Sequence, residues 1–336
     1  MLITKDDLDI MQNWPLDKKI RVTQSKIIEW YNHYNGNVYV SFSGGKDSLV
    51  LLDLARRVYP DIPAVFIDTG LEFPEIKSFV STFDNVTTIR PKMNFMEVIK
   101  KYGYPVISKE VSNCIYGARL GQKGRMDSLN GNIFNKAGKK IYDKSKYKYL
   151  LDAPFKISDK CCNVTKKAPS KTFESKTKLK PIVGTRTEES SLRKMSWYKT
   201  GCNSFEGRTQ KSRPLSFWTE QDILKYISIT GIKLCSLYGD VKIEKDSYSF
   251  WYGTDPEPDR YKLSGENSTG CVYCMFGCQY DKKYFDDLTR FEKLKITHPK
   301  LYNYCINGGE YKDGLWQPNS KGLGLNKVLD FINIGY

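Results

Sequence analysis

The stretch SGGKDS at residues 43–48 combines residue types that bind phosphate groups. Adjacent glycines let successive backbone N–H groups converge on an anion, and a helix starting near Ser48 would add its positive end. The lysine supplies a point charge, the aspartate could hold Mg²⁺, and the serines offer hydroxyls. The alternative is an ordinary strand–turn–helix corner without a ligand. The expected ligand-binding residues are Ser43, Gly44, Gly45, Lys46, Asp47 and Ser48, and we expect Lys46 and Asp47 also to be catalytic.

The spacing of SGGKDS separates it from two common phosphate loops. A G-x-x-x-x-G-K-[ST] loop needs four residues between its glycines, and a dinucleotide fingerprint needs G-x-G-x-x-G. Here the two glycines are adjacent.

Three further charged residues could contact a nucleotide. Asp68 ends a predicted strand, where it could coordinate Mg²⁺ or bond to ribose. Arg186 and Arg193 are seven residues apart, which is two helical turns, so both could face one anion. The alternatives are that Asp68 is a carboxylate in an ordinary turn and that Arg186 and Arg193 lie on the surface without a ligand.

The nine cysteines include a group with metal-ligand spacing. Two are adjacent, and three more follow in a C-x-x-C-x-x-x-C pattern, so several thiolates can turn onto one metal. Zinc would need four tetrahedral ligands, whereas an iron–sulfur cluster accepts cysteines from separate segments, and the residues leave this choice open. The five candidate ligands are Cys161, Cys162, Cys271, Cys274 and Cys278. Cys202 competes with them, and the thiols expected to be small buried hydrophobes are Cys114, Cys235 and Cys305.

Strands and helices alternate along the first part of the chain. The predicted strands cover residues 37–42, 61–68, 85–91 and 181–186, and the predicted helices cover 48–58, 74–83, 94–103 and 108–120, with a further helix after the Thr219 N-cap and two more at about 283–296 and 323–333. This pattern predicts an α/β fold with a doubly wound, mostly parallel sheet, whose strand ends would carry the chemistry. We expect a nucleotide-binding domain at 1–230, with a basic insertion at about 121–149, and a helical, cysteine-containing C-terminal region at 231–336.

Composition narrows the class of partner. The chain has 336 residues and a net charge of +15, which favours a polyanionic partner, nucleic acid first. Lysine alternates with tyrosine in the insertion, a mix that can follow a nucleic-acid backbone and stack a base, although solvated lysines are the alternative. No apolar run approaches the roughly 18–20 residues that cross a bilayer. We therefore expect a cytoplasmic protein without a membrane partner.

Four motifs together resemble one superfamily. SGGKDS after a strand resembles the pyrophosphate loop of the N-type ATP pyrophosphatases, of the adenine nucleotide α-hydrolase type, which cleave ATP between the α- and β-phosphates and adenylate an acceptor. Within it, DTGLEFPE at 68–75, GTRTEESSLR at 184–193 and PLSFWTEQDI at 214–223 resemble motifs of the phosphoadenylyl-sulfate (PAPS) reductase family.

The resemblance implies a Rossmann-like fold and assigns roles. It places Asp68, Thr69 and Gly70 at the nucleotide, and it implies that Arg186 and Arg193 act at the substrate as catalytic residues. Adenylyl-sulfate reductases bind a 4Fe–4S cluster through a tandem Cys-Cys and a later C-x-x-C. The resemblance therefore implies a cluster on Cys161, Cys162, Cys271 and Cys274, with Cys278 as a fifth candidate and zinc as the alternative metal.

Two departures from the reductases direct the functional hypothesis. Reductases carry a catalytic cysteine in an E-C-G-x-H-type tail, whereas this sequence ends LDFINIGY. An intact SGGKDS is typical of relatives that consume ATP, such as phosphorothioation enzymes. We expect an enzyme that uses ATP and Mg²⁺ to adenylate an acceptor, with sulfur passing from a donor protein to a nucleic acid. The alternatives are reduction of adenylyl sulfate or phosphoadenylyl sulfate to sulfite, and a nucleotide-binding regulator without turnover.

Overall fold

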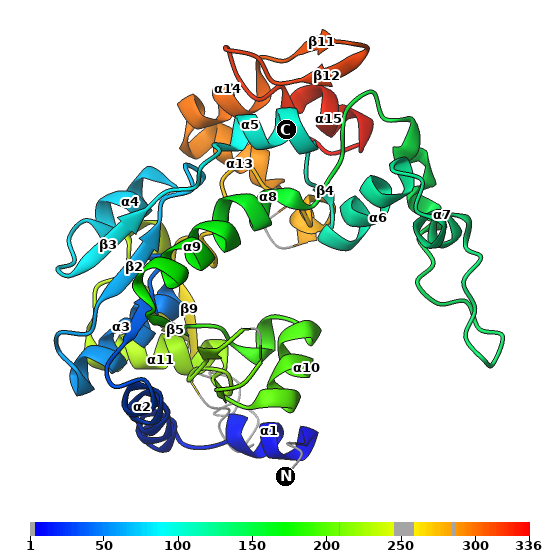
Figure 1. Ribbon diagram of the computed structural model, residues 1–336. Coiled ribbons are helices and arrows are strands. Elements are labelled where there is room, and N and C mark those ends of the chain that lie inside the picture. Colours follow the sequence, from blue (N-terminus) through cyan, green and yellow to red (C-terminus); the bar gives the residue numbers. More distant parts are fainter. Residues whose placement is uncertain (1–3, 208, 245–258, 284–286) are drawn as a thin grey trace, which may run out of the picture. The chain divides into compact units, whose positions relative to one another are not determined.

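The computed structural model describes residues 4–207, 209–244, 259–283 and 287–336 (Figure 1). Unit 1 comprises residues 1–68, 72–90 and 170–270, and unit 2 comprises 69–71, 91–169 and 271–336. Both units are discontinuous in sequence. This division differs from the expected boundary near residue 230, because residues 91–169 pack with the C-terminal segment instead of with the N-terminal strands.

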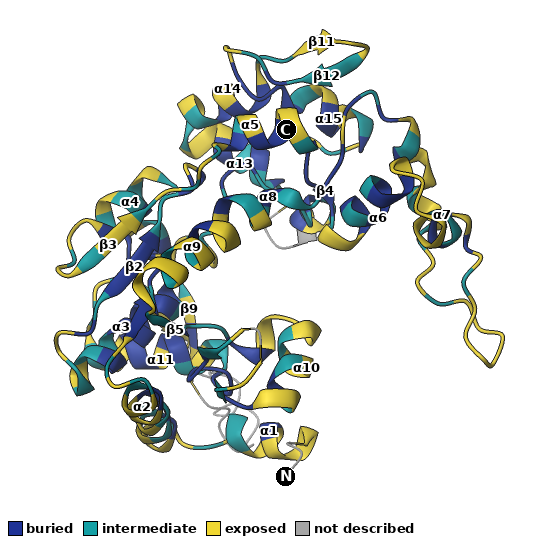
Figure 2. Ribbon diagram, in the orientation of Figure 1, coloured by how far each residue is buried: buried dark blue, intermediate teal, exposed yellow. Residues whose placement is uncertain are grey.

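Unit 1 contains a six-stranded sheet in the order β3-β2-β1-β5-β7-β6. All neighbouring pairs are parallel except β6 and β7, which confirms the expected α/β class with a mostly parallel sheet. Figure 2 shows β2 as a buried strand, in keeping with its apolar sequence AVFI. The strands are β1 (Val38–Ser41), β2 (Ala64–Ile67), β3 (Val86–Ile89), β5 (Lys180–Val183), β6 (Asn203–Ser204) and β7 (Lys211–Ser212).

Helices pack on this sheet and define its core. They are α1 (Lys5–Gln12), α2 (Leu16–His33), α3 (Lys46–Val58), α4 (Pro74–Val80), α10 (Ser191–Thr200) and α11 (Glu220–Thr230), with α9 (Ala168–Thr177) reaching into the unit from residue 168. A hairpin of β8 (Val241–Glu244) and β9 (Arg260–Leu263) contacts α11.

The buried face of α2 joins the core of unit 1. The Trp218 indole N–H donates a 2.8 Å hydrogen bond to the Thr23 hydroxyl, and Lys19 forms a buried ion pair with Asp222. Trp218 and Leu215 of the PLSFWTEQDI motif are fully buried. Thr219 caps α11 through a reciprocal bond with Asp222, so the expected N-cap is confirmed.

Unit 2 is mainly helical, with short two-stranded pairs. Its helices are α5 (Phe95–Tyr102), α6 (Lys109–Arg119), α7 (Lys123–Asn130), α8 (Lys160–Cys162), α13 (Arg290–Thr297), α14 (Pro299–Ile306) and α15 (Leu325–Phe331). β4 (Val106–Ile107) pairs in parallel with β10 (Met275–Phe276), which brings the segment after Cys271 beside the segment before α6. β11 (Glu310–Lys312) and β12 (Leu315–Gln317) form a hairpin.

The four predicted strands and the first predicted helices are confirmed. The insertion at 121–149 contains α7 and leads into a 3₁₀ segment at Ser145–Asp152, so it is not all loop. The helix expected at 283–296 begins at Arg290, and residues 284–286 of that range lie outside the described residues. No helix within the described ranges has the length and apolarity needed to cross a bilayer.

Candidate functional site

The SGGKDS loop connects β1 to α3, with Gly45 as the residue that precedes the helix. Gly44 has φ +73°, in the left-handed region that favours glycine. A Cβ atom at Gly44 would also lie 2.9 Å from the Cγ2 atoms of Ile76 and Val80 on α4. Gly44 is therefore required both by its backbone angle and by the close packing of α4.

The two serines of the loop hold it together. The Ser48 hydroxyl accepts the Ser43 backbone N–H over 3.1 Å and donates to the Gly45 carbonyl over 2.8 Å. The hydroxyl oxygens of Ser43 and Ser48 are also 3.1 Å apart. Both hydroxyls, expected to bind a ligand, bond within the loop in this structure.

Lys46 is buried and has partners from three distant segments. Its ammonium group donates to the Asn267 carbonyl over 2.6 Å and lies 3.1 Å from a carboxylate oxygen of Glu220. Its backbone N–H donates to the Tyr238 hydroxyl over 3.2 Å, and that hydroxyl lies 2.7 Å from the hydroxyl of Thr269. An N–H group that would face a phosphate thus already has an acceptor.

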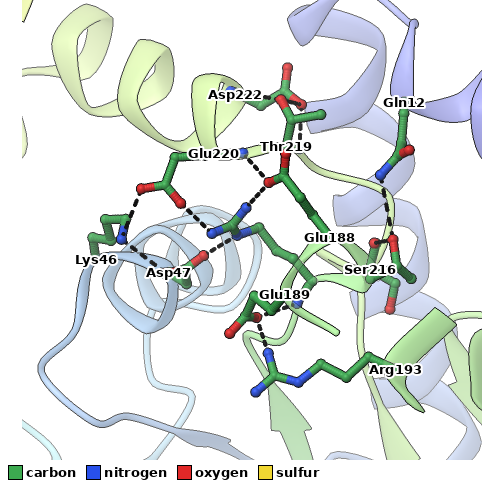
Figure 3. Close-up of polar contacts among 12 residues, drawn as sticks. Gln12, Lys46, Asp47, Glu188, Glu189, Arg193, Ser216, Thr219, Glu220 and Asp222 are labelled. Atoms are coloured by element: carbon green, nitrogen blue, oxygen red, sulfur yellow. Dashed lines mark hydrogen bonds and ion pairs between the residues drawn. The ribbon is translucent and has the colours of Figure 1, made fainter. Parts of the chain in front are cut away.

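Arg186 joins three carboxylates in one network, and Figure 3 labels these partners, Asp47, Glu188 and Glu220. Its guanidinium forms ion pairs with Asp47, Glu188 and Glu220, the last at 2.6 Å. Burial by itself lowers the pKa of Arg186, but the attraction of these carboxylates outweighs it and raises the pKa. The structure thus joins Asp47 of the loop to Arg186 from the GTRTEESSLR motif, as expected for residues of one site.

Arg193 does not belong to the carboxylate network around Arg186. The expectation that Arg186 and Arg193 lie two turns apart on one helix is wrong, because α10 begins only at Ser191 and Arg186 precedes a short 3₁₀ turn. Arg193 instead forms an ion pair with Glu189, which also accepts the backbone N–H of Arg186 over 2.9 Å.

A pocket of about 610 Å³ opens beside these residues. Its volume is within the range of small-molecule sites, about 300–1,000 Å³. It is lined by Lys46, Asp47, Arg186, Glu189, Glu220, Gln221, Leu224, Tyr261, Lys262, Leu263, Asn267 and Ser268. Three carboxylates balance three cations in this lining. A nucleotide triphosphate would therefore need additional positive charge, which Mg²⁺ can supply.

Asp68 follows β2 and forms ion pairs with Lys77 at 2.7 Å and Arg90 at 3.1 Å. Thr69 and Gly70 belong to unit 2, where the Thr69 hydroxyl accepts the Leu71 N–H over 3.2 Å. Gly70 has φ +76°. The roles expected for these residues at a nucleotide remain predictions.

The five candidate metal-binding cysteines all belong to unit 2. Cys161 and Cys162 end α8, with their sulfur atoms 3.9 Å apart, and the backbone N–H of Cys274 bonds to the Cys271 carbonyl. A hydrogen bond to Cys162 is the main cause that raises the pKa of Cys161, followed by burial and by the charges of Cys162, Cys274 and Cys271. Cys161 thus interacts electrostatically with Cys162, Cys271 and Cys274, and Cys274 also interacts with Cys278.

Cys278 differs from these four. Its buried thiol donates to the Met275 carbonyl over 3.0 Å, and burial raises its pKa to about 12. Cys202 belongs to unit 1, and burial raises its pKa as well. The structure confirms the three thiols that were expected to be buried, which are Cys114, Cys235 and Cys305.

The geometry of the cysteine group does not match a site for a single metal ion. Among the described side chains, no three histidine, cysteine or carboxylate groups lie close enough together to hold one ion. An iron–sulfur cluster binds each thiolate to a different iron, so its cysteines lie farther apart than the ligands of one zinc. The donor set of four thiols from two segments fits such a cluster.

Three residues of the site were not predicted from the sequence: Glu220, Tyr238 and Asn267. Glu220 lies within the PLSFWTEQDI motif and is the first residue of α11, directly after the Thr219 cap, so the motif is a signal that could have identified it. Tyr238 and Asn267 come from a segment without a recognisable motif, and only the folded structure brings them to the loop.

The chain matches one protein-family model over most of its length. The Phosphoadenosine phosphosulfate reductase domain matches residues 37–114 and 115–278. The match begins just before β1, includes the loop and Arg186, and extends through the cysteines.

Curated relatives fall into two groups. An uncharacterized protein of Methanocaldococcus jannaschii is 40% identical over 95 residues, 27% of this chain and 23% of that protein, so this chain spans under a quarter of that relative. Adenosine 5'-phosphosulfate reductases from Geobacillus kaustophilus and Bacillus anthracis are 26% and 23% identical, covering 60% and 73% of this chain and 67% and 90% of theirs.

Two solved structures resemble this chain at low scores. A phosphoadenylyl-sulfate reductase from Candida auris has a TM-score of 0.37 and 16% identity, covering 70% of this chain and 92% of its own. An FMN adenylyltransferase from Candida glabrata has a TM-score of 0.35 and 14% identity, covering 69% and 64%. Scores of this size support no statement about the present chain.

Proposed function

Because the chain belongs to the phosphoadenosine phosphosulfate reductase domain family, we propose that it binds an adenine nucleotide at the SGGKDS loop and uses ATP to adenylate an acceptor. One observation carries this proposal: Asp47 of the loop, Arg186 and Glu220 form one network beside a pocket of nucleotide size. An intact phosphate loop with a charge-balanced lining suits MgATP.

The chemistry would be an in-line displacement. A nucleophilic atom of the acceptor attacks the α-phosphorus of ATP, the bond between that phosphorus and the bridging oxygen breaks, and pyrophosphate leaves. The acceptor proton passes to a pocket carboxylate such as Glu189 or to water. Lys46 and Arg186 would stabilise the charge that develops on the phosphate oxygens. Asp47 and Glu220 would hold Mg²⁺ in exchange for their present cationic partners.

Sulfur would then replace the adenylate. A persulfide of a sulfur-donor protein attacks the carbon or phosphorus atom bonded to the adenylated oxygen, and AMP leaves with that oxygen. A second thiol of the donor then cleaves the S–S bond, which releases the thiolated product and leaves a disulfide on the donor. A 4Fe–4S cluster on Cys161, Cys162, Cys271 and Cys274 would supply sulfur-binding or electron-transfer chemistry when bound. The net charge of +15 supports a nucleic acid as the acceptor.

Reduction of adenylyl sulfate is the second candidate, and the names of two relatives favour it. In that reaction a thiol attacks the sulfur of adenylyl sulfate, AMP leaves, and a second thiol releases sulfite from the resulting thiosulfonate as a disulfide forms. The two candidates differ in whether ATP or adenylyl sulfate is consumed.

The test uses anaerobically purified protein with Mg²⁺ and α-labelled ATP, with and without single-stranded nucleic acid and a persulfide donor. Release of AMP and pyrophosphate together is the expected result. Formation of sulfite from adenylyl sulfate with a thiol reductant, without any ATP cleavage, would replace the first candidate by the second. Tight ATP binding without either reaction would instead favour a regulatory role.

A further inference from the structure

The positive charge of the protein is concentrated in unit 2. Its residues include 26 lysines and arginines against 13 aspartates and glutamates, a net charge of +13 out of +15 for the chain. Unit 1, which contains the SGGKDS loop and the nucleotide pocket, carries the remaining +2. A bound nucleotide therefore does not account for the basic excess.

A second pocket, within unit 2, gathers three of these charges. It has a volume of about 240 Å³, and Lys100 of α5, Lys156 and Lys312 of the β11–β12 hairpin line it together with Trp316. All three lysines are exposed. In the part of the chain that the structure describes, none of the three ammonium groups forms an ion pair, although Asp313 also lines the pocket.

The pocket walls are fixed by backbone contacts. The Trp316 backbone N–H donates to the Pro154 carbonyl over 2.6 Å, and its indole N–H donates to the Gly324 carbonyl over 2.8 Å. The Tyr104 N–H donates to the Lys156 carbonyl over 2.8 Å. These bonds join the hairpin, the segment around residue 156 and the end of α5, which are the three segments that carry the lysines.

Gly103 shows how close this packing is. Its φ is +113°, and a Cβ atom there would lie 2.3 Å from the carbonyl carbon of Lys156. The backbone that carries Lys156 therefore lies directly against the end of α5, where no side chain fits between them.

We propose that this pocket, the lysine–tryptophan pocket, binds one nucleotide of a single-stranded nucleic acid. The ammonium groups of Lys100, Lys156 and Lys312 would hold a backbone phosphate, and the Trp316 indole would contact the adjoining base. Ammonium groups without carboxylate partners favour a polyanion, and an aromatic wall favours an unpaired base over a duplex. DNA and RNA strands share this chemistry.

The pocket deepens the proposed function because it would hold the acceptor strand, but binding itself needs neither ATP nor turnover. The basic insertion at 121–149 belongs to the same unit and adds a net charge of +6. Part of that charge is already paired, since Lys144 lies 3.1 Å from Glu110.

Fluorescence anisotropy without ATP tests the pocket, using labelled single-stranded DNA, single-stranded RNA and duplex DNA. The triple variant K100A/K156A/K312A should bind either single strand at least tenfold more weakly at about 0.1 M salt. The slope of log K against log salt concentration should flatten by about 0.7, the value expected for the loss of one phosphate contact with a single strand. The charge-matched control K199A/K225A/K233A removes three exposed lysines of unit 1 and should bind as the wild type does.

The base contact needs a separate readout. Trp316 is the only tryptophan of unit 2, so a 5-bromouracil strand irradiated on the protein should crosslink to the peptide containing Trp316, and W316F should lose that crosslink. If the triple alanine variant does not fold, K312E on the exposed hairpin tests the same charge.

Three results would contradict the proposal that this pocket binds a single strand. They are pocket variants that bind the strand as tightly as the control variant does, a crosslink confined to other peptides, and duplex DNA bound as tightly as single strands. Failure of the proposed function looks different. If the strand binds through the lysines but does not stimulate release of pyrophosphate, the pocket binds nucleic acid and the nucleic acid is not the acceptor of the adenylate.

Discussion

The backbone N–H of Lys46 donates a hydrogen bond to the hydroxyl of Tyr238 over 3.2 Å, across 192 residues of sequence. Lys46 is the first residue of α3, so this N–H is one of the helix-end donors that a bound anion would use. The Tyr238 hydroxyl therefore occupies an acceptor position that a phosphate oxygen would take.

Replacing Tyr238 with phenylalanine should strengthen nucleotide binding. Removing the hydroxyl removes the competing acceptor, and a net hydrogen bond of about 1 kcal/mol corresponds to roughly fivefold in affinity. Isothermal titration with a non-hydrolysable ATP analogue and Mg²⁺ measures the change. Y226F, which removes a hydroxyl bonded to Asp53 elsewhere in unit 1, is the control and should leave affinity unchanged. Weaker binding by Y238F would show that the hydroxyl contacts the ligand directly.

Asp47→Ala should abolish release of pyrophosphate. Asp47 is the loop carboxylate that Arg186 contacts, and its loss would remove the proposed Mg²⁺ ligand, so turnover should fall about a hundredfold or more. The control D17N removes an exposed carboxylate from a surface pair with Arg21 and should be fully active. An active D47A enzyme with normal Mg²⁺ dependence would remove Asp47 from this role.

Single cysteine-to-serine variants should divide the candidate ligands into two sets. Iron and acid-labile sulfide measured on anaerobically purified protein should be lost in C161S, C162S, C271S and C274S. C278S should retain both, because the Cys278 thiol already bonds to the Met275 carbonyl. Wild-type protein that contains stoichiometric zinc and no iron would contradict the cluster, and C305S, a fully buried thiol, controls for loss of packing.

Thr23→Val should destabilise unit 1 by about 1–3 kcal/mol. The Thr23 hydroxyl accepts the buried indole N–H of Trp218 and donates to the Pro214 carbonyl, so valine leaves both groups unsatisfied. Urea denaturation followed by tryptophan fluorescence measures the free energy of unfolding. T88V, on the exposed side of β3, is the matched control. Equal stability of T23V and wild type would mean that water replaces the lost bonds.

Glu174→Gln should stabilise the protein at neutral pH and lose that advantage in acid. Burial raises the pKa of Glu174 above its usual 4.5, so the folded state holds this proton more tightly than the unfolded state does. The resulting stability is present at low pH and is lost as pH rises through the raised pKa. Glutamine keeps the Tyr39 hydrogen bond without the charge. The Tm difference between E174Q and wild type should therefore shrink as pH falls through the raised pKa towards 4.5, whereas E206Q, at an exposed position, should show no such trend.

Local sequence patterns predicted the part of the fold that local physics determines. Apolar strand runs and the Thr219 cap identified the sheet and α11, because burial and capping depend on neighbouring residues. The amphipathic helix α2 was not anticipated, although its buried residues Ile27 and Trp30 are at helical spacing.

The site was only partly predictable for a physical reason. Asp47 and Arg186 lie in short motifs at strand ends, and parallel topology brings such ends together. Arg193 was misplaced because seven-residue spacing implies a shared face only within a continuous helix, and the chain breaks between the two arginines. Tyr238 and Asn267 reach the loop through long-range packing, which no local pattern records.

The short helix α4 contacts two parts of unit 1, the SGGKDS loop and the Asp68 carboxylate. Ile76 and Val80 pack where a Cβ of Gly44 would lie, and Lys77 on the same helix pairs with Asp68 at the end of β2. The loop and Asp68 thus both pack against the same helix. A shift of α4 along its axis would disturb both at once, so this helix links the position of the SGGKDS loop to that of the Asp68 carboxylate.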